Sequence, residues 1–221
     1  MNEKLTAGLE KLGLAADEEQ LRAFDSYVES VLDCNRTYNL MKADSADELV
    51  VSHLLDSLAA VSHISAIMEK IRSTFSDGGP LQVGDIGSGG GCPGVPLAVM
   101  FPDVSFTLVE RMERRCVFLE SAVAKMGLKN VKVFCTQASS VPKESFHMQV
   151  FRAFHPFDPK IAALLLGMAK KGGYIVAYKA RSEKIQAEME EVSKQIPSWK
   201  KIPLTVPFLE DHERNLVIIR K

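Results

Sequence analysis

The stretch that decides the fold is QVGDIGSGGGCPGVPL, residues 82–97. A short apolar run ends at Ile86, four glycines crowd the turn that follows, and a helix is expected to begin near Pro96. Glycines permit positive φ angles and let a ligand approach the backbone closely. The first strand-to-helix turn of an α/β sheet lies at the carboxyl edge, where ligands bind. The stretch therefore predicts the first ligand-binding loop of such a sheet.

The spacing of the glycines indicates the class of ligand. The dinucleotide pattern G-x-G-x-x-G would need glycine at position 92, where Cys92 stands, and the register that begins at Gly89 places a proline where the helix would open. A phosphate-binding P-loop would need Gly-Lys-Ser/Thr, which the loop lacks. The loop instead has an acid followed by alternating glycines, and this resembles motif I of the class I S-adenosylmethionine-dependent methyltransferases. The positions are Asp85, Gly87, Gly89 and Gly91.

A second acid stands where the next strand is expected to end. Glu110 follows the apolar run Ser105–Val109, 25 residues after Asp85. A carboxylate at this edge can accept the hydroxyls of an adenosine ribose. The alternative is a solvated acid that complements the dipole of the following helix. Because the glycine loop precedes it, we favour the ribose role.

After Pro80 the chain alternates short apolar runs with helical patterns. Such alternation predicts an α/β fold with a mostly parallel, seven-stranded Rossmann-like sheet over residues 76–221, and the last two strands, with no helix between them, predict a hairpin at its edge. Residues 1–75 predict a helical N-terminal extension, and the polar, Gly/Pro-containing segment Ser73–Pro80 is the expected boundary. The predicted strands are Leu81–Ile86, Ser105–Val109, Val131–Cys135, Met148–Arg152, Gly173–Tyr178, Trp199–Val206 and Asn215–Ile219. The predicted helices are Pro96–Phe101, Arg111–Met126, Pro159–Lys170 and Glu183–Gln195, with earlier ones beginning at Asp17 and near Ser45.

Composition sets aside several protein classes. The 221 residues are 46% hydrophobic and 25% charged, as in folded soluble proteins. Apolar runs such as Ile161–Ala169 are shorter than the ~20 residues that span a bilayer, and the N-terminus lacks an apolar signal core. The four cysteines (Cys34, Cys92, Cys116 and Cys135) form no CxxC or Cys/His cluster. This predicts reduced thiols in a cytoplasmic protein and no metal site.

Charge is unevenly distributed along the chain, although the net charge is only −1. Residues 1–80 contain 7 Lys and Arg against 14 Asp and Glu, a net charge of −7. Residues 81–221 contain 20 against 14, a net charge of +6. The basic second part favours a polyanionic partner, although two solvated surfaces of opposite sign would give the same numbers.

Further short motifs run through the chain on both sides of the loop. They are Tyr38–Asn39–Leu40, His53–Leu54–Leu55–Asp56–Ser57, Phe151–Arg152–Ala153–Phe154, Tyr178–Lys179 and Arg214–Asn215–Leu216–Val217. With the loop from Asp85 to Pro96 they resemble the bacterial 16S rRNA guanine-N7 methyltransferases of the RsmG/GidB family over nearly the full length. The resemblance implies methylation of N7 of one guanosine in the 530-loop of 16S rRNA, within the small ribosomal subunit or an assembly intermediate. It also implies S-adenosyl-L-methionine as the methyl donor.

The resemblance assigns cofactor contacts by motif position. These contacts are expected from Asp85, Gly87, Gly89, Gly91, Cys92, Glu110, Ala138, Ser139 and Arg152. Three positions depart from the family pattern. Cys92 replaces an aromatic or aliphatic residue, Ser139 replaces an acid that would bond the adenine amino group, and Ala180 replaces a glycine.

The chemistry expected here needs no general base, because N7 of guanine carries a lone pair and no proton. In-line transfer of the methyl group mainly requires alignment and a suitable electrostatic environment. Arg152 and Lys179 are the candidate catalytic residues, and Arg114, Arg115 and Arg214 are candidate contacts to RNA. Their alternatives are a structural ion pair for Arg152 and solvated surface positions for the others.

Several residues, and the function itself, allow more than one interpretation from the sequence. His53 and Asp56 lie three apart on one helical face, where they can position RNA or form a buried pair that holds the N-terminal helices to the sheet. Cys92 has no apparent histidine partner and is expected to pack near the cofactor. The alternative functions are a methyltransferase of small molecules or proteins, a non-catalytic RNA-binding relative and a nicotinamide oxidoreductase. A monomer is expected.

Overall fold

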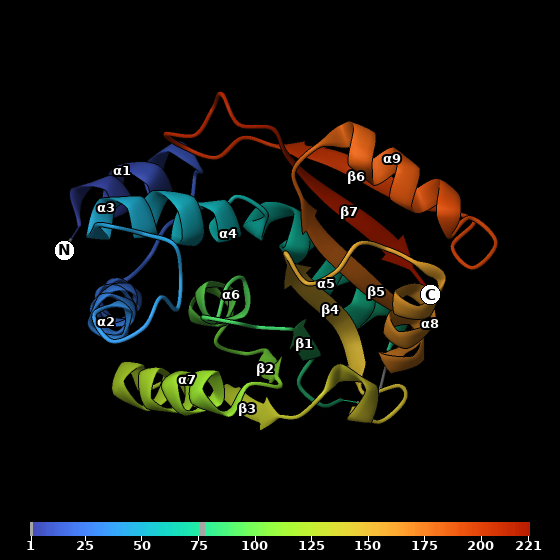
Figure 1. Cartoon of the computed structure of the whole chain (residues 1–221), viewed down its shortest axis with the longest axis horizontal. Helices are drawn as coiled ribbons and strands as arrows, with labels where there is room; N and C mark the ends of the chain where they lie inside the picture. The colour runs from blue at the N-terminus through green and yellow to red at the C-terminus, as the bar shows by residue number, and fades with distance from the viewer. Residues whose placement is uncertain (1, 76–77) are drawn as a thin grey trace.

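All seven predicted strands form, and they join in one sheet. The computed structural model describes residues 2–75 and 78–221. The strands are β1 Gln82–Ile86, β2 Ser105–Glu110, β3 Val131–Cys135, β4 Phe146–Arg152, β5 Ala169–Lys179, β6 Trp199–Leu204 and β7 Arg214–Arg220. Their order is β3-β2-β1-β4-β5-β7-β6 (Figure 1). The first five are parallel, whereas β7 runs antiparallel to both β5 and β6.

The predicted edge hairpin is confirmed, with one addition: β7 inserts between β5 and β6, so that β6 is the edge strand. β5 begins at Ala169, inside the helix predicted to reach Lys170, because it pairs with Phe146 at the start of β4. Within the expected boundary Ser73–Pro80, residues 76 and 77 lie outside the described residues.

Helices cover both faces of the sheet (Figure 1). The core helices are α6 Gly94–Met100, α7 Glu113–Met126, α8 Pro159–Met168 and α9 Ser182–Glu191, with a 3₁₀ turn at Ala138–Ser140. The N-terminal ones are α1 Glu3–Lys11, α2 Glu18–Asn35, α3 Ala46–Leu49, the π-helical turn Val50–Leu55, α4 Asp56–Leu58 and α5 Val61–Thr74. α1 to α7 pack into one apolar cluster on one face, and α8 and α9 into a second cluster on the other.

The alternation of side chains along β5 separates these two clusters. Val176 and Tyr178 point into the cluster shared with the N-terminal helices, while Ile175 and Ala177 point toward α8 and α9. All four are buried, which explains why the strand reads as a continuous apolar run.

Two N-terminal helices, α2 and α3, begin where the sequence predicts. Asp17 caps α2 in a reciprocal box with Gln20, and the hydroxyl of Ser45 accepts the Glu48 amide at the start of α3. The helical segment from Ala46 to Thr74 is long and apolar enough, by length and composition, to cross a bilayer. A search for uninterrupted apolar runs in the sequence does not detect this segment. In the fold, 61% of its most apolar window is buried, as in a core helix.

The cysteine prediction is wrong for one pair. Cys116 and Cys135 form a disulfide, with Cα atoms 5.7 Å apart, while Cys34 and Cys92 are free. The first turns of α7 lie beside the end of β3, which brings together two residues 19 positions apart. Sequence spacing alone does not reveal this proximity.

Candidate active site

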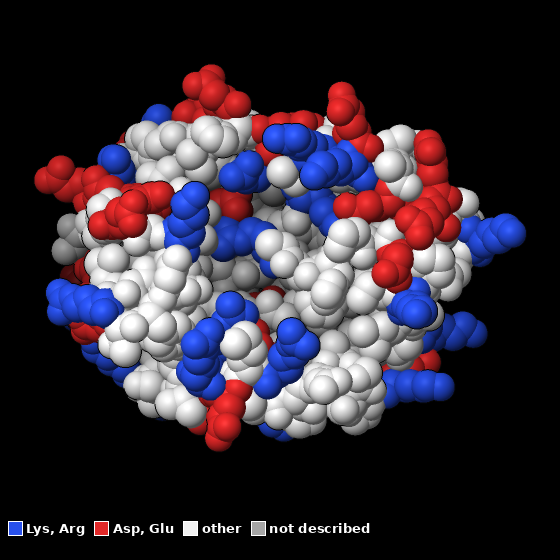
Figure 2. All heavy atoms as spheres, in the orientation of Figure 1, with Lys and Arg blue, Asp and Glu red and all other residues white. Residues whose placement is uncertain are grey.

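Two adjoining cavities open at the carboxyl ends of β1, β2, β4 and β5. The larger is about 880 Å³ and the smaller about 390 Å³. The larger one is walled partly by the N-terminal helices, and the smaller one by the sheet core alone. The two share five lining residues: Gly87, Arg115, Ala153, Phe154 and His155. In Figure 2 this face is hollowed at its centre, with Lys and Arg side chains around the hollow.

The glycine loop adopts the backbone that its sequence predicts. Gly87, Gly89 and Gly91 have φ angles of 70°, 61° and 103°, a region that favours glycine. A Cβ at Gly87 would collide with the ring of Phe154, so the loop backbone stays bare at the junction of the cavities.

Asp85 lies beneath this loop and lines neither cavity. Its Oδ2 accepts the Ser88 hydroxyl at 2.7 Å and the Gly94 amide at 3.0 Å, which fixes the loop onto the end of β1. Its Oδ1 is buried without a hydrogen-bond partner among the described residues. Burial raises the pKa of Asp85 to about 6, against the two hydrogen bonds that lower it. Asp85 therefore reaches a ligand only through the loop.

Glu110 ends β2 at the wall of the smaller cavity, and backbone amides hold its carboxylate. Oε1 accepts the amides of Arg111 and Met112, each at 2.8 Å, and Oε2 accepts the Gly89 amide at 2.9 Å. An ionised carboxylate oxygen accepts two hydrogen bonds, so Oε2 keeps one free position. Ala138 and Ser139 line the same cavity from the 3₁₀ turn after β3.

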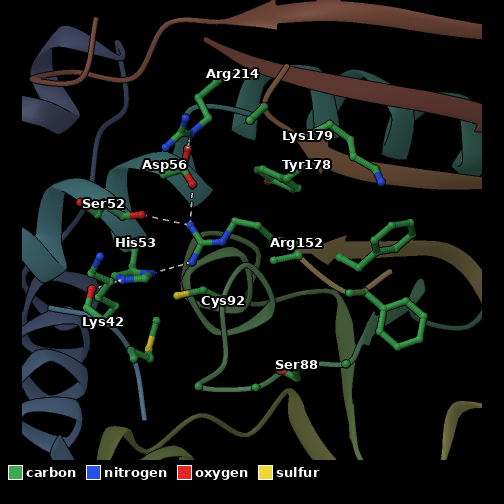
Figure 3. Close-up of a pocket in the computed structure, with 18 of the residues that line it drawn as sticks. Lys42, Ser52, His53, Asp56, Ser88, Cys92, Arg152, Tyr178, Lys179 and Arg214 are labelled. Carbon is green, nitrogen blue, oxygen red and sulfur yellow. Dashed lines mark hydrogen bonds and ion pairs between the residues drawn. The ribbon is translucent and has the colours of Figure 1, made fainter. Parts of the chain in front are cut away.

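Arg152 ends β4 and reaches into the larger cavity (Figure 3). Its Nη1 donates to Asp56 at 2.6 Å and to the Ser52 carbonyl at 3.2 Å, and its Nη2 bonds Nδ1 of His53 at 2.8 Å. The next residue, Ala153, has a φ of 53°, which is uncommon for a residue other than glycine. This turn brings the chain back over the glycine loop.

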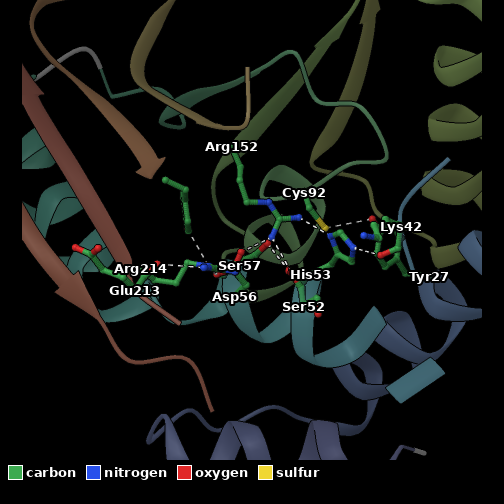
Figure 4. A network of polar contacts seen from close by, with 11 residues as sticks. Tyr27, Lys42, Ser52, His53, Asp56, Ser57, Cys92, Arg152, Glu213 and Arg214 are labelled. Carbon is green, nitrogen blue, oxygen red and sulfur yellow. Dashed lines mark hydrogen bonds and ion pairs between the residues drawn. The ribbon is translucent and has the colours of Figure 1, made fainter. Parts of the chain in front are cut away.

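Asp56 bridges two arginines, as Figure 4 shows. Besides Arg152, it accepts Nε of Arg214, from the start of β7, at 2.9 Å. The side chain of Asp56 is 95% buried, that of Arg152 82% and that of Arg214 73%. In the sequence, Asp56 is an acid within the apolar segment LLDSL, residues 54–58. A buried acid needs a hydrogen-bonding or charged partner, but the sequence does not identify which residue provides it.

Two tyrosines tie the N-terminal helices to the site, and the sequence predicts neither role. Tyr27 of α2 donates to the Gly90 carbonyl at 2.6 Å and lies 3.3 Å from the Cys92 sulfur. Tyr178 of β5 donates to the Ser57 carbonyl at 2.8 Å. Tyr27 stands in an apolar helical pattern, so nothing local distinguishes it from a core aromatic residue. Cys92 is buried and lines the larger cavity.

The other predicted residues are placed less directly. Lys179 lines the larger cavity but pairs with Glu188 at 2.6 Å, which neutralises its charge there. Arg115 lines both cavities and lies 3.8 Å from the Glu110 carboxylate. Arg114 lines neither cavity and stacks over the Tyr38 ring, with 4.9 Å from its guanidinium carbon to the ring centroid.

These residues fit S-adenosylmethionine. The smaller cavity offers a carboxylate oxygen with a free acceptor position beside small side chains, as an adenosine needs. The bare glycine backbone joins it to the larger cavity. The unpartnered Oδ1 of Asp85 beneath the loop favours a cationic ligand above it.

The comparisons with known proteins agree with this geometry. The family model of GidB, described as rRNA small subunit methyltransferase G, matches residues 20–217. The chain is 35% identical to the ribosomal RNA small subunit methyltransferase G of Treponema denticola, covering 98% of this chain and 93% of that protein. It is 32% identical to that of Neisseria meningitidis, covering 99% and 98%.

Solved structures share the fold at low sequence identity. The tRNA methyltransferase TrmI from Aquifex aeolicus superposes with a TM-score of 0.56 and 17% identity, covering 76% of this chain and 68% of that one. A predicted O-methyltransferase from Agrobacterium tumefaciens gives 0.55 and 17%, covering 68% and 78%. These likenesses establish the class I methyltransferase fold. With its sequence matched over nearly the whole length, the chain belongs to the GidB family and is a methyltransferase that uses S-adenosylmethionine.

Proposed function

We propose that this enzyme methylates N7 of one guanosine in the 530-loop of 16S rRNA, in the cytoplasm, on the small ribosomal subunit or an assembly intermediate. The observation that carries the proposal is the Arg152 guanidinium, fixed in a cavity that adjoins the cofactor side and opens toward a basic rim. When bound, S-adenosylmethionine supplies an electrophilic methyl group.

The smaller cavity holds and orients the adenosine in this proposal. Glu110 offers Oε2 to one ribose hydroxyl while the Gly89 amide occupies its other position. Ala138 and Ser139 line the adenine side. The glycine backbone, kept bare by its positive φ angles, faces the methionine part.

Arg152 orients the target base. A guanidinium carries five N–H groups, and hydrogen bonds among the described residues use three of them. The remaining N–H groups can donate to O6 of guanine, which is next to N7 on the same edge of the base. No proton needs to leave N7, so the site requires no general base, and holding the base in line with the methyl group is the main task.

The rim of the larger cavity supports a polyanionic substrate. Figure 2 shows Lys and Arg side chains on several sides of the hollow, although Glu48, Asp56 and Glu188 also line the larger cavity. Lys42, Arg115 and Arg214 line the cavity itself, and Arg114 lies beside it on α7. Phosphate contacts of this kind position an RNA without reading its sequence.

The decisive test is transfer of a radiolabelled methyl group from S-adenosylmethionine to small subunits that lack the modification, followed by nucleoside analysis. We expect label in 7-methylguanosine, and its loss in Arg152→Ala. Arg22→Ala, which removes an exposed arginine of α2 that lines neither cavity, is the control and should keep wild-type activity. Cofactor binding without label in free RNA, subunits or intermediates would overturn the proposal.

A further inference from the structure

The π-helical turn Val50–Leu55 is the part of the N-terminal extension that faces Arg152. π-Helical turns are rare, and they are frequently found at functional sites. Here the turn presents the Ser52 carbonyl and the His53 ring to the guanidinium, and Asp56 follows directly. One short helical segment therefore supplies all three acceptors that hold Arg152.

The two ring nitrogens of His53 have fixed roles in this arrangement. A guanidinium can only donate hydrogen bonds, so Nδ1 accepts from Nη2 of Arg152 at 2.8 Å. Nε2 then carries the ring proton and donates to the Lys42 carbonyl at 3.1 Å. A doubly protonated ring would direct an N–H at the guanidinium and place a second positive charge beside it. Only the neutral Nε2–H tautomer satisfies both contacts.

We infer that His53 is a positioning residue that, as the neutral Nε2–H tautomer, holds the Arg152 guanidinium in the cavity. The inference rests on the proposed function, in which Arg152 contacts the target guanosine. Protonation of Nδ1 removes the acceptor and repels Arg152, so the guanidinium leaves its productive orientation while the cofactor side of the site is unchanged. At acidic pH, therefore, the rate of methyl transfer decreases while the affinity for S-adenosylmethionine is unchanged.

The surroundings of His53 keep it neutral near physiological pH. The charged or titratable groups around the ring are Glu48 on α3, Asp56 on α4, Arg152 at the end of β4, Lys42 on the preceding loop and Cys92 on the glycine loop. Burial and the charge of Arg152 lower the pKa of His53 from 6.5, against the smaller opposing effects of the hydrogen bond to the Lys42 carbonyl and the charges of Asp56 and Glu48. α1 packs on the same turn through an apolar contact with Leu55.

Three variants separate positioning from a merely structural role. His53→Asn places an amide oxygen near the position of Nδ1, an acceptor that does not titrate. His53→Ala removes the acceptor. His63→Gln, on α5 and outside both cavities, is the matched control. For each, kcat and KM for methyl transfer to unmodified small subunits are measured from about pH 5 to pH 8, the range in which histidine titrates.

We expect the wild-type kcat to fall as the pH drops below 6.5, and His53→Asn to keep most of the neutral kcat without this acidic fall. His53→Ala should lose up to about 100-fold in kcat at neutral pH, since small misplacements of a positioning group have effects of this size. Its affinity for S-adenosylhomocysteine should stay within about twofold, because the smaller cavity is intact. Wild-type kcat in His53→Ala, or an unchanged acidic fall in His53→Asn, would overturn the inference.

A second readout does not depend on activity. The ¹⁵N shifts of the His53 ring in the free wild-type protein should report the Nε2–H tautomer, and the Arg152 guanidinium signal should shift on acidification in the wild type but not in His53→Asn. A proton on Nδ1 at neutral pH would overturn the inference even if His53→Ala failed to fold. If these signals behave as expected but the wild type methylates no rRNA, the proposed function fails and the positioning role of His53 stands.

Discussion

The two cavities are built in different ways. The smaller one is shaped by local backbone: a glycine loop at the end of β1 and a carboxylate at the end of β2, held by amides one, two and 21 residues away. The larger one depends on side chains brought together from distant segments. Asp56 pairs with Arg152 across 96 residues and with Arg214 across 158. The substrate half therefore requires the N-terminal extension to be docked, whereas the cofactor half meets this extension mainly where Tyr27 bonds the glycine loop.

The largest effect is expected where this docking is broken. Asp56→Ala leaves two partly buried arginines without their carboxylate, and removing one partner of a buried ion pair costs about 3–5 kcal/mol. For a chain of this size the melting temperature should fall on the order of 10 °C. Methyl transfer should be nearly abolished, because Arg152 is no longer held.

The control for Asp56→Ala is Asp103→Ala, which breaks the exposed pair with Arg72. Exposed pairs contribute about 0–1 kcal/mol, so this variant should melt within a few degrees of the wild type. Thermal unfolding and methyl-transfer assays of both variants check the prediction. Equal losses in the two variants would show that the Asp56 bridge does not tie the two parts together.

The same contrast explains what the sequence reveals. The glycine loop, Glu110 and all seven strands follow from spacing and periodicity, because each depends on residues close in the chain. The partners of Asp56 and the Cys116–Cys135 disulfide depend on how distant elements dock, which no local pattern encodes. At Lys179 the sequence predicts a place at the end of a strand, which β5 confirms, but it does not predict the pairing with Glu188.

The second test acts on the loop that joins the cavities. Gly91 has a φ of 103°, and a Cβ there would lie 2.8 Å from Val95 and 3.1 Å from Leu119. Gly91→Ala combines backbone strain with this collision, so we expect a loss of about 3 kcal/mol in the free energy of unfolding. S-adenosylhomocysteine should bind at least about tenfold more weakly, since about 1.4 kcal/mol of distortion at the loop suffices for that.

Gly127 offers the matched control. Its φ is 71°, but a Cβ would meet nothing within 4 Å. Gly127→Ala should cost about 1 kcal/mol through strain alone and leave ligand affinity unchanged. Urea unfolding and calorimetry measure both quantities. Equal weakening of ligand binding in the two variants would mean that the loop conformation does not shape the site.

A third test uses the pH dependence of Asp85, the buried support of the loop. Its folded pKa of about 6 exceeds the usual 3.8, so the folded protein binds an extra proton between these values. The free energy of unfolding should therefore fall by about 2–3 kcal/mol as the pH rises from 4 to 6, and stay level above that. Asp85→Asn, which does not titrate, should lack this fall.

The measurement is urea unfolding at pH 4, 5, 6 and 7 for wild type and Asp85→Asn, compared as the difference between the two so that other groups cancel. Asp211→Asn, the same chemical change at an exposed loop position, is the matched control. Parallel curves for wild type and Asp85→Asn would contradict a raised pKa at Asp85.

The smallest effect is expected at Ser139 in the smaller cavity, where the family resemblance leads us to expect an acid. Ser139→Asp places an acid on the wall proposed to face the adenine, and one added hydrogen bond contributes about 1 kcal/mol. S-adenosylhomocysteine should bind about fivefold more tightly. Ser140→Asp, on the same 3₁₀ turn but outside the cavity lining, adds the same charge and should have no effect. Equal changes in S-adenosylhomocysteine affinity in both variants would indicate a general effect of charge. Unchanged affinity in both would mean that the backbone and Ala138, and not a side chain at position 139, recognise the adenine.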